Sequence, residues 1–67
     1  FGFEPVCGEV YHLYEVEGRR QLSMIAPAEW HQRWLGSVRL NADGRWQIEK
    51  AAPDFNIRDW VQTSAAP

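Results

Sequence analysis

Residues 9–26 read EVYHLYEVEGRRQLSMIA, a run that predicts a β-hairpin. β-branched and aromatic side chains are typical of strands, and they dominate the first half of this run. Glu17-Gly18 then supplies a two-residue turn, with glycine at a position that needs a positive φ. Counting outward from this turn gives the expected pairs Val16–Arg19, Tyr14–Gln21, Leu13–Leu22, His12–Ser23 and Tyr11–Met24. Because side chains alternate along a strand, one face should carry Tyr11, Leu13, Leu22 and Met24, and the other His12, Tyr14, Gln21 and Ser23.

A second hairpin is predicted from residue 35 to residue 50. Residues 35–40 read LGSVRL and suit a strand, and the NADG run at residues 41–44 is the strongest turn signal in the chain. We expect a three-residue loop that ends in a left-handed Gly44. The resulting pairs are Leu40–Trp46 and Val38–Ile48 on one face, with Arg39 and Gln47 on the other.

Two short helical turns complete the expected fold. Pro27 lacks a backbone N–H and suits the first position of a helix over residues 27–34, and apolar residues with helical spacing indicate another over residues 53–61. The sequence therefore predicts a mainly β (β-rich α+β) fold, an antiparallel meander of about four strands with two short helical turns. We expect one domain over residues 1–62 and a loose tail at residues 63–67. The predicted core is Tyr11, Leu13, Leu22, Met24, Trp34, Val38, Leu40, Trp46, Ile48 and Trp60.

Composition limits the partners and the compartment. The 67-residue chain has a net charge of −2, which argues against nucleic acid or an anionic membrane as a partner. No apolar run approaches the ~18 residues that a membrane span needs. Cys7 is the only cysteine, which excludes an intrachain disulfide and favours a reducing compartment, so we expect a cytoplasmic protein.

Patterns that suggest catalysis or metal binding are incomplete. His12 opposite Ser23 would place an imidazole beside a hydroxyl, as acyl transfer requires, but an open sheet face neither excludes water nor supplies an oxyanion hole. Cys7, His12 and His31 lack the spacing of a zinc finger, so we interpret Cys7 as a small buried or half-buried thiol. The sequence therefore predicts no enzyme, no metal site and no cofactor.

Two functions remain open at this point. The chain has 4 tryptophans in 67 residues, more than a thin core hides, and surplus apolar surface on a small protein marks a partner site. The first hypothesis is a non-enzymatic interaction module that binds a protein partner or a second copy of itself, with Trp30, Trp34 and Tyr14 as anchors. The alternative is a small-ligand or nucleotide-responsive domain that uses the outward face of His12, Tyr14, Ser23 and Arg39.

A family resemblance covers residues 8–46. The residues that carry it are YHLY at 11–14, LSMIAPAEW at 22–30, LG at 35–36 and the tryptophan that follows the 41–44 turn. These motifs resemble domain-of-unknown-function family 2452, in which the spacing of Ser23, Pro27, Glu29 and Trp30 is the most specific part. Ala26 stands where the family has serine, so a serine N-cap is lost here. The resemblance implies a soluble intracellular protein, and it brings no known activity or catalytic residues.

Overall fold

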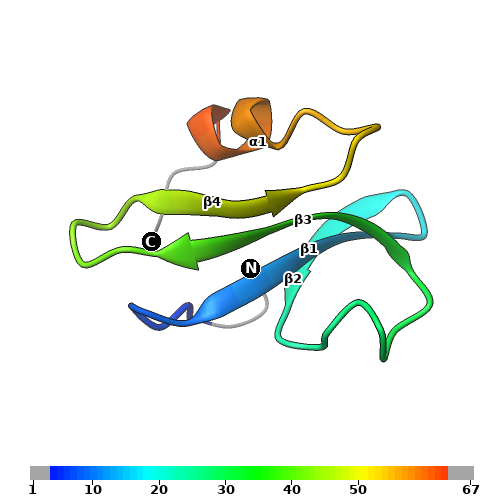
Figure 1. Cartoon of the computed structure of the whole chain (residues 1–67), viewed down its shortest axis with the longest axis horizontal. Coiled ribbons are helices and arrows are strands. Elements are labelled where there is room, and N and C mark those ends of the chain that lie inside the picture. The colour runs from blue at the N-terminus through cyan, green and yellow to red at the C-terminus, as the bar shows by residue number, and fades with distance from the viewer. Residues whose placement is uncertain (1–3, 64–67) are drawn as a thin grey trace.

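Four antiparallel strands form one sheet in the order β2-β1-β3-β4, and a short helix packs on it (Figure 1). The computed structural model describes residues 4–63. Its elements are β1 (Val10–Val16), β2 (Arg19–Ser23), β3 (Arg33–Leu40), β4 (Trp46–Ala51) and α1 (Ile57–Thr63). The mainly β prediction is confirmed. Thr63 ends α1, and the rest of the tail that we predicted to be loose lies outside the described residues.

The strand order differs from the predicted meander. In a meander each strand pairs with the next along the chain, whereas here β1 lies between β2 and β3. Residues 24–32, which we call the crossing segment, therefore pass over β1 on the way from β2 to β3. The physical reason is that β1 buries large side chains on both faces, since Leu13 is 1% exposed and Tyr14 is 0% exposed. A strand with two apolar faces is stable only where both are covered.

The first hairpin forms in the predicted register as far as Ser23. Glu17 and Gly18 both have positive φ, at 50° and 77°, which is characteristic of the tight turn that matches the twist of the strands. The expected pair of Tyr11 and Met24 does not form, because β2 ends at Ser23. Met24 therefore belongs to the crossing segment rather than to the sheet.

The second hairpin also has the predicted register. Leu40 pairs with Trp46 and Val38 with Ile48, and Gly44 has a φ of 81° in the connecting loop. The loop thus needs the left-handed conformation that glycine adopts without steric cost.

The core lies between the sheet and α1. Its buried members are Tyr11, Leu13, Leu22, Leu35, Val38, Leu40, Trp46, Ile57 and Trp60, with Ile48, Phe55 and Val61 packed against them. Gly36 permits the close approach of α1, because a Cβ at this position would lie 2.9 Å from the Lys50 carbonyl oxygen and would meet Cδ1 of Ile57. The glycine is therefore required by packing between β3 and α1.

Two predicted core residues lie elsewhere. Met24 is 64% exposed, because it follows the last residue of β2. Trp34 is half-buried, because it pairs with Tyr14 across β1 and β3 and lies on the face away from the core. Leu35 and Ile57, which the prediction omitted, are buried members of the core.

Of the two predicted helical turns, only the second, at residues 53–61, corresponds to a helix within residues 4–63. α1 begins at Ile57, later than the predicted start at residue 53. No helix covers residues 27–34, because residues 27–29 form a turn, in which Glu29 N–H donates to the Ala26 carbonyl at 2.9 Å, and β3 already begins at Arg33. A short helix is costly to nucleate, whereas early entry into β3 pairs these residues with β1. The described part of the chain has no helix long and apolar enough to span a membrane.

Candidate functional site

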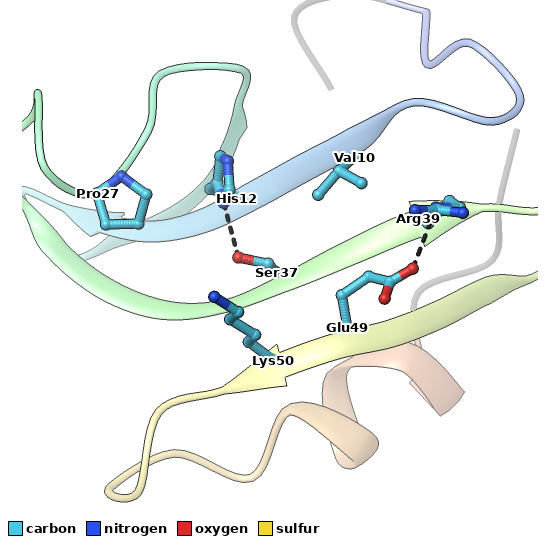
Figure 2. Close-up of a pocket in the computed structure, with 7 residues that line it drawn as sticks. All are labelled: Val10, His12, Pro27, Ser37, Arg39, Glu49 and Lys50. Carbon is cyan, nitrogen blue, oxygen red and sulfur yellow. Dashed lines mark hydrogen bonds and ion pairs between the residues drawn. The ribbon is translucent and has the colours of Figure 1, made fainter.

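The sheet face opposite α1 carries a groove of about 290 Å³. β1, β3 and β4 supply most of its walls, and Pro27 of the crossing segment stands at one end (Figure 2). The lining residues are Val10, His12, Pro27, Ser37, Arg39, Glu49 and Lys50. This groove combines apolar and polar side chains on a face that the helix leaves open, and it is the candidate site.

Strand alternation and one bulge assemble the groove. His12 and Ser37 are direct partners across β1 and β3, on the face opposite Leu13 and Val38. The register of β3 and β4 shifts between Ser37 and Val38, so that Lys50 rather than Glu49 pairs with Ser37. Bulges commonly re-aim a side chain in this way. Lys50 therefore extends toward the His12–Ser37 pair instead of toward the core (Figure 2).

A chain of hydrogen bonds fixes the floor of the groove. Trp34 Nε1–H donates to Ser37 Oγ at 3.2 Å, and Ser37 Oγ lies 2.7 Å from His12 Nδ1. The indole is a donor only, so the Ser37 hydroxyl proton is available to His12 Nδ1. We assign the tautomer from this network, which leaves the proton of neutral His12 on Nε2. Within residues 4–63, His12 Nε2 makes no hydrogen bond, so this N–H remains available as a donor.

The electrostatic environment favours uncharged His12. Burial lowers the pKa of His12 from its ordinary value of 6.5, and the positive charge of Lys50 lowers this pKa further. Both effects favour the neutral imidazole, in agreement with its role as an acceptor from Ser37.

The groove has an excess of positive charge. Arg39 Nε and Glu49 Oε1 form an ion pair at 3.0 Å, which compensates the charge of Arg39. Lys50 lines the same groove and forms no ion pair with any residue between 4 and 63. Lys50 is thus the uncompensated charge of the groove.

Tyr14 lies beneath the crossing segment and Trp30 is part of that segment, so neither side chain lies on an open sheet face. The Tyr14 hydroxyl donates a short hydrogen bond to the Ile25 carbonyl, and the Trp30 ring packs edge-on at 4.7 Å from the Tyr14 ring. Burial, and next the negative charge of Glu29, raises the pKa of Tyr14. The expectation that Tyr14 is exposed is therefore wrong, because the crossing segment covers it, while Trp30 is half-buried.

Ser23 does not contact His12 through its hydroxyl. The two residues are Cα partners as predicted, but Ser23 Oγ accepts a hydrogen bond from Ile25 N–H at 3.1 Å. The imidazole is hydrogen-bonded instead to Ser37, which was not among the predicted site residues. Alternation backward from Leu40 through Val38 could have placed Ser37 on the face of His12, whereas Lys50 depends on the bulge and has no local signal.

Of the predicted site residues, the structure therefore brings His12 and Arg39 into the groove. Trp34 does not line the groove but donates a hydrogen bond to Ser37. The other predicted residues, Tyr14, Ser23 and Trp30, make contacts that hold the crossing segment.

The cysteine differs from its predicted environment. Cys7 is exposed, with its thiol 3.7 Å from the Asn41 carbonyl oxygen, so the interpretation as a buried or half-buried thiol is wrong. Among residues 4–63, no three histidine, cysteine or acidic side chains are grouped so that they could hold a metal ion.

Comparison with known proteins places this fold in a family. A family model described as "Protein of unknown function (DUF2452)" matches residues 2–62. The chain belongs to this family. The match extends beyond residues 8–46 in both directions, and in this DUF2452 member it spans the whole sheet, the groove and most of α1. No curated protein and no solved structure shows significant similarity to the chain.

Proposed function

We propose that this protein is a non-enzymatic binding domain that holds a small ligand in the groove of the open sheet face. The observation that carries the proposal is the convergence of His12, Ser37 and Lys50 between the apolar side chains of Val10 and Pro27. Apolar walls with a few convergent polar groups are typical of ligand sites, and a volume of about 290 Å³ is just below the range of such sites, roughly 300–1,000 Å³.

The hydrogen bonds of Ser37 support binding rather than covalent catalysis. Its side chain is buried, at 3% exposed, and its hydroxyl oxygen is engaged by both Trp34 and His12. A nucleophile needs an accessible oxygen and a base oriented by a third group. No carboxylate between residues 4 and 63 forms a hydrogen bond with His12, so the base would have no such support.

The experiment is a fragment screen on ¹⁵N-labelled protein, read by amide chemical shifts. We expect shifts that cluster on Val10, His12, Ser37 and Lys50. A Val10→Trp variant, which fills the groove, should abolish them. Val6→Trp is the matched control, because Val6 is 58% exposed and does not line the groove. Shifts that persist in Val10→Trp would refute the proposal.

A second candidate is the interaction module that the sequence suggests. Tyr14 is fully buried, which argues against this side chain as one of the three predicted anchors. The consecutive residues Met24 and Ile25 are 64% and 42% exposed and favour a different contact surface on the crossing segment. Light scattering over a tenfold concentration range tests self-association. A constant monomer mass would argue against it, and a dimer that Met24→Ser with Ile25→Ser dissociates would support it.

A further inference from the structure

We propose that the groove recognises a small monocarboxylate with a short apolar tail, with Lys50 as the residue that binds the carboxylate. This inference rests on the proposed function, because it names the ligand class for the same groove.

The charge balance of the groove favours a single negative charge. Arg39 is already paired with Glu49 at 3.0 Å, so among the residues that line this groove Lys50 carries the only positive charge that forms no ion pair with residues 4–63. A monoanion would compensate this charge. A phosphate dianion would bring a second negative charge next to Glu49, and the groove offers no second free cation to match it.

The hydrogen-bond donors also fit a carboxylate. The ammonium of Lys50 is a flexible point charge with three donors. Neutral His12 has its Nε2–H available, because Nδ1 is occupied by Ser37. A carboxylate accepts through both oxygens, so one can bond to Lys50 and the other to His12. An amide of the same shape would place its NH₂ against one of these donors.

The apolar residues define the rest of the ligand. Val10 and Pro27 line the groove and offer no side-chain hydrogen-bonding group. A branched tail of a few carbons fits within about 290 Å³ and would cover these two side chains. The groove offers a single uncompensated cation, which does not match the phosphate charge of a nucleotide, and this separates the proposed ligand class from the nucleotide that the sequence left open.

The probe is 3-methylbutanoate, titrated into the whole chain at pH 7. We expect a dissociation constant on the order of 1 mM, as is usual for a ligand of this size. The isosteric amide 3-methylbutanamide and the tail-less acetate should each bind at least about tenfold more weakly. Methyl phosphate tests the excluded dianion.

Lys50 offers a direct reporter, because it is the only lysine in the sequence. Reductive ¹³C-methylation labels Lys50 and the terminal amine, and the Lys50 signal should move on addition of 3-methylbutanoate and stay in place with the amide. Lys50→Gln should weaken carboxylate binding at least about tenfold, and Lys50→Arg should restore part of it. Arg45→Gln is the matched control, since it removes one positive charge from an exposed residue outside the groove.

The outcomes separate this inference from the proposed function. If fragments shift the groove residues but the amide equals the carboxylate, or Lys50→Gln and Arg45→Gln bind equally well, the carboxylate assignment is overturned while the groove stands. Tighter binding of methyl phosphate than of 3-methylbutanoate would also overturn it. If no fragment of any charge shifts the groove residues, both the inference and the proposed function fall.

Discussion

The Trp30 indole lies edge-on against the Tyr14 phenol, with ring centroids 4.7 Å apart and planes inclined at 68°. Tyr14 also donates to the Ile25 carbonyl, so one buried side chain of β1 holds the crossing segment at two points. Pro27 lies between these points in the chain and stands at the end of the groove. The Tyr14–Trp30 pair therefore positions one end of the candidate site as well as covering β1.

Trp30→Ala should destabilise the protein by about 1–3 kcal/mol, because it removes an aromatic pair and uncovers Tyr14. Urea denaturation followed by circular dichroism measures this loss. Trp30→Phe keeps a ring against Tyr14 and should lose less than half as much. An unchanged midpoint in Trp30→Ala would show that the crossing segment is held by other contacts.

Gly36→Ala should destabilise the protein by about 1–3 kcal/mol through overpacking. The added Cβ would meet Cδ1 of Ile57 and would lie 2.9 Å from the Lys50 carbonyl oxygen. Ile57→Val removes Cδ1, so the double variant should be more stable than the sum of the two single losses predicts. Denaturation of all four proteins completes this cycle. Strict additivity would show that Ile57 is not the side chain that excludes a Cβ at residue 36.

The sequence was sufficient for the hairpins because their signals are local. Glu17-Gly18 and residues 41–44 set the turns, and the registers follow by counting. Strand order is not local, since it depends on whether β3 pairs with β1 or with β2. The prediction placed Tyr14 on a solvent-exposed face because it assumed a sheet with only one apolar face. That assumption led both to the predicted meander and to the prediction of Tyr14 as an exposed anchor.

The candidate site was predictable only in part, for a similar reason. Alternation places His12 and Arg39 on one face, and both line the groove. Strict alternation from Trp46 and Ile48 would place Lys50 on the core side, and the bulge reverses this. Nothing in the residues around Glu49 signals a bulge, so the charged residue that we propose to bind the ligand emerges only from the three-dimensional pairing.

The pH dependence of stability should report the environment of His12. Its pKa is lowered in the folded protein, first by burial and then by Lys50, from the ordinary value of 6.5 that the unfolded chain retains. The unfolded chain therefore binds more protons between the folded pKa and 6.5, and the free energy of unfolding rises with pH across this window. The contribution is fully present above pH 6.5 and is lost as the pH falls through the folded pKa of His12.

Urea denaturation from pH 5 to pH 8 at constant ionic strength measures this effect. His12→Asn keeps a polar group close to the position of Nδ1 and does not titrate, so its stability should change less over the window than that of the wild type. Lys50→Gln keeps the imidazole but removes the neighbouring charge, so its profile should lie between the other two. The three proteins differ only at residues 12 and 50, so differences between their profiles report these two positions. Parallel profiles for the wild type and His12→Asn would contradict a lowered pKa, and would indicate that His12 is as well solvated in the folded protein as in the unfolded chain.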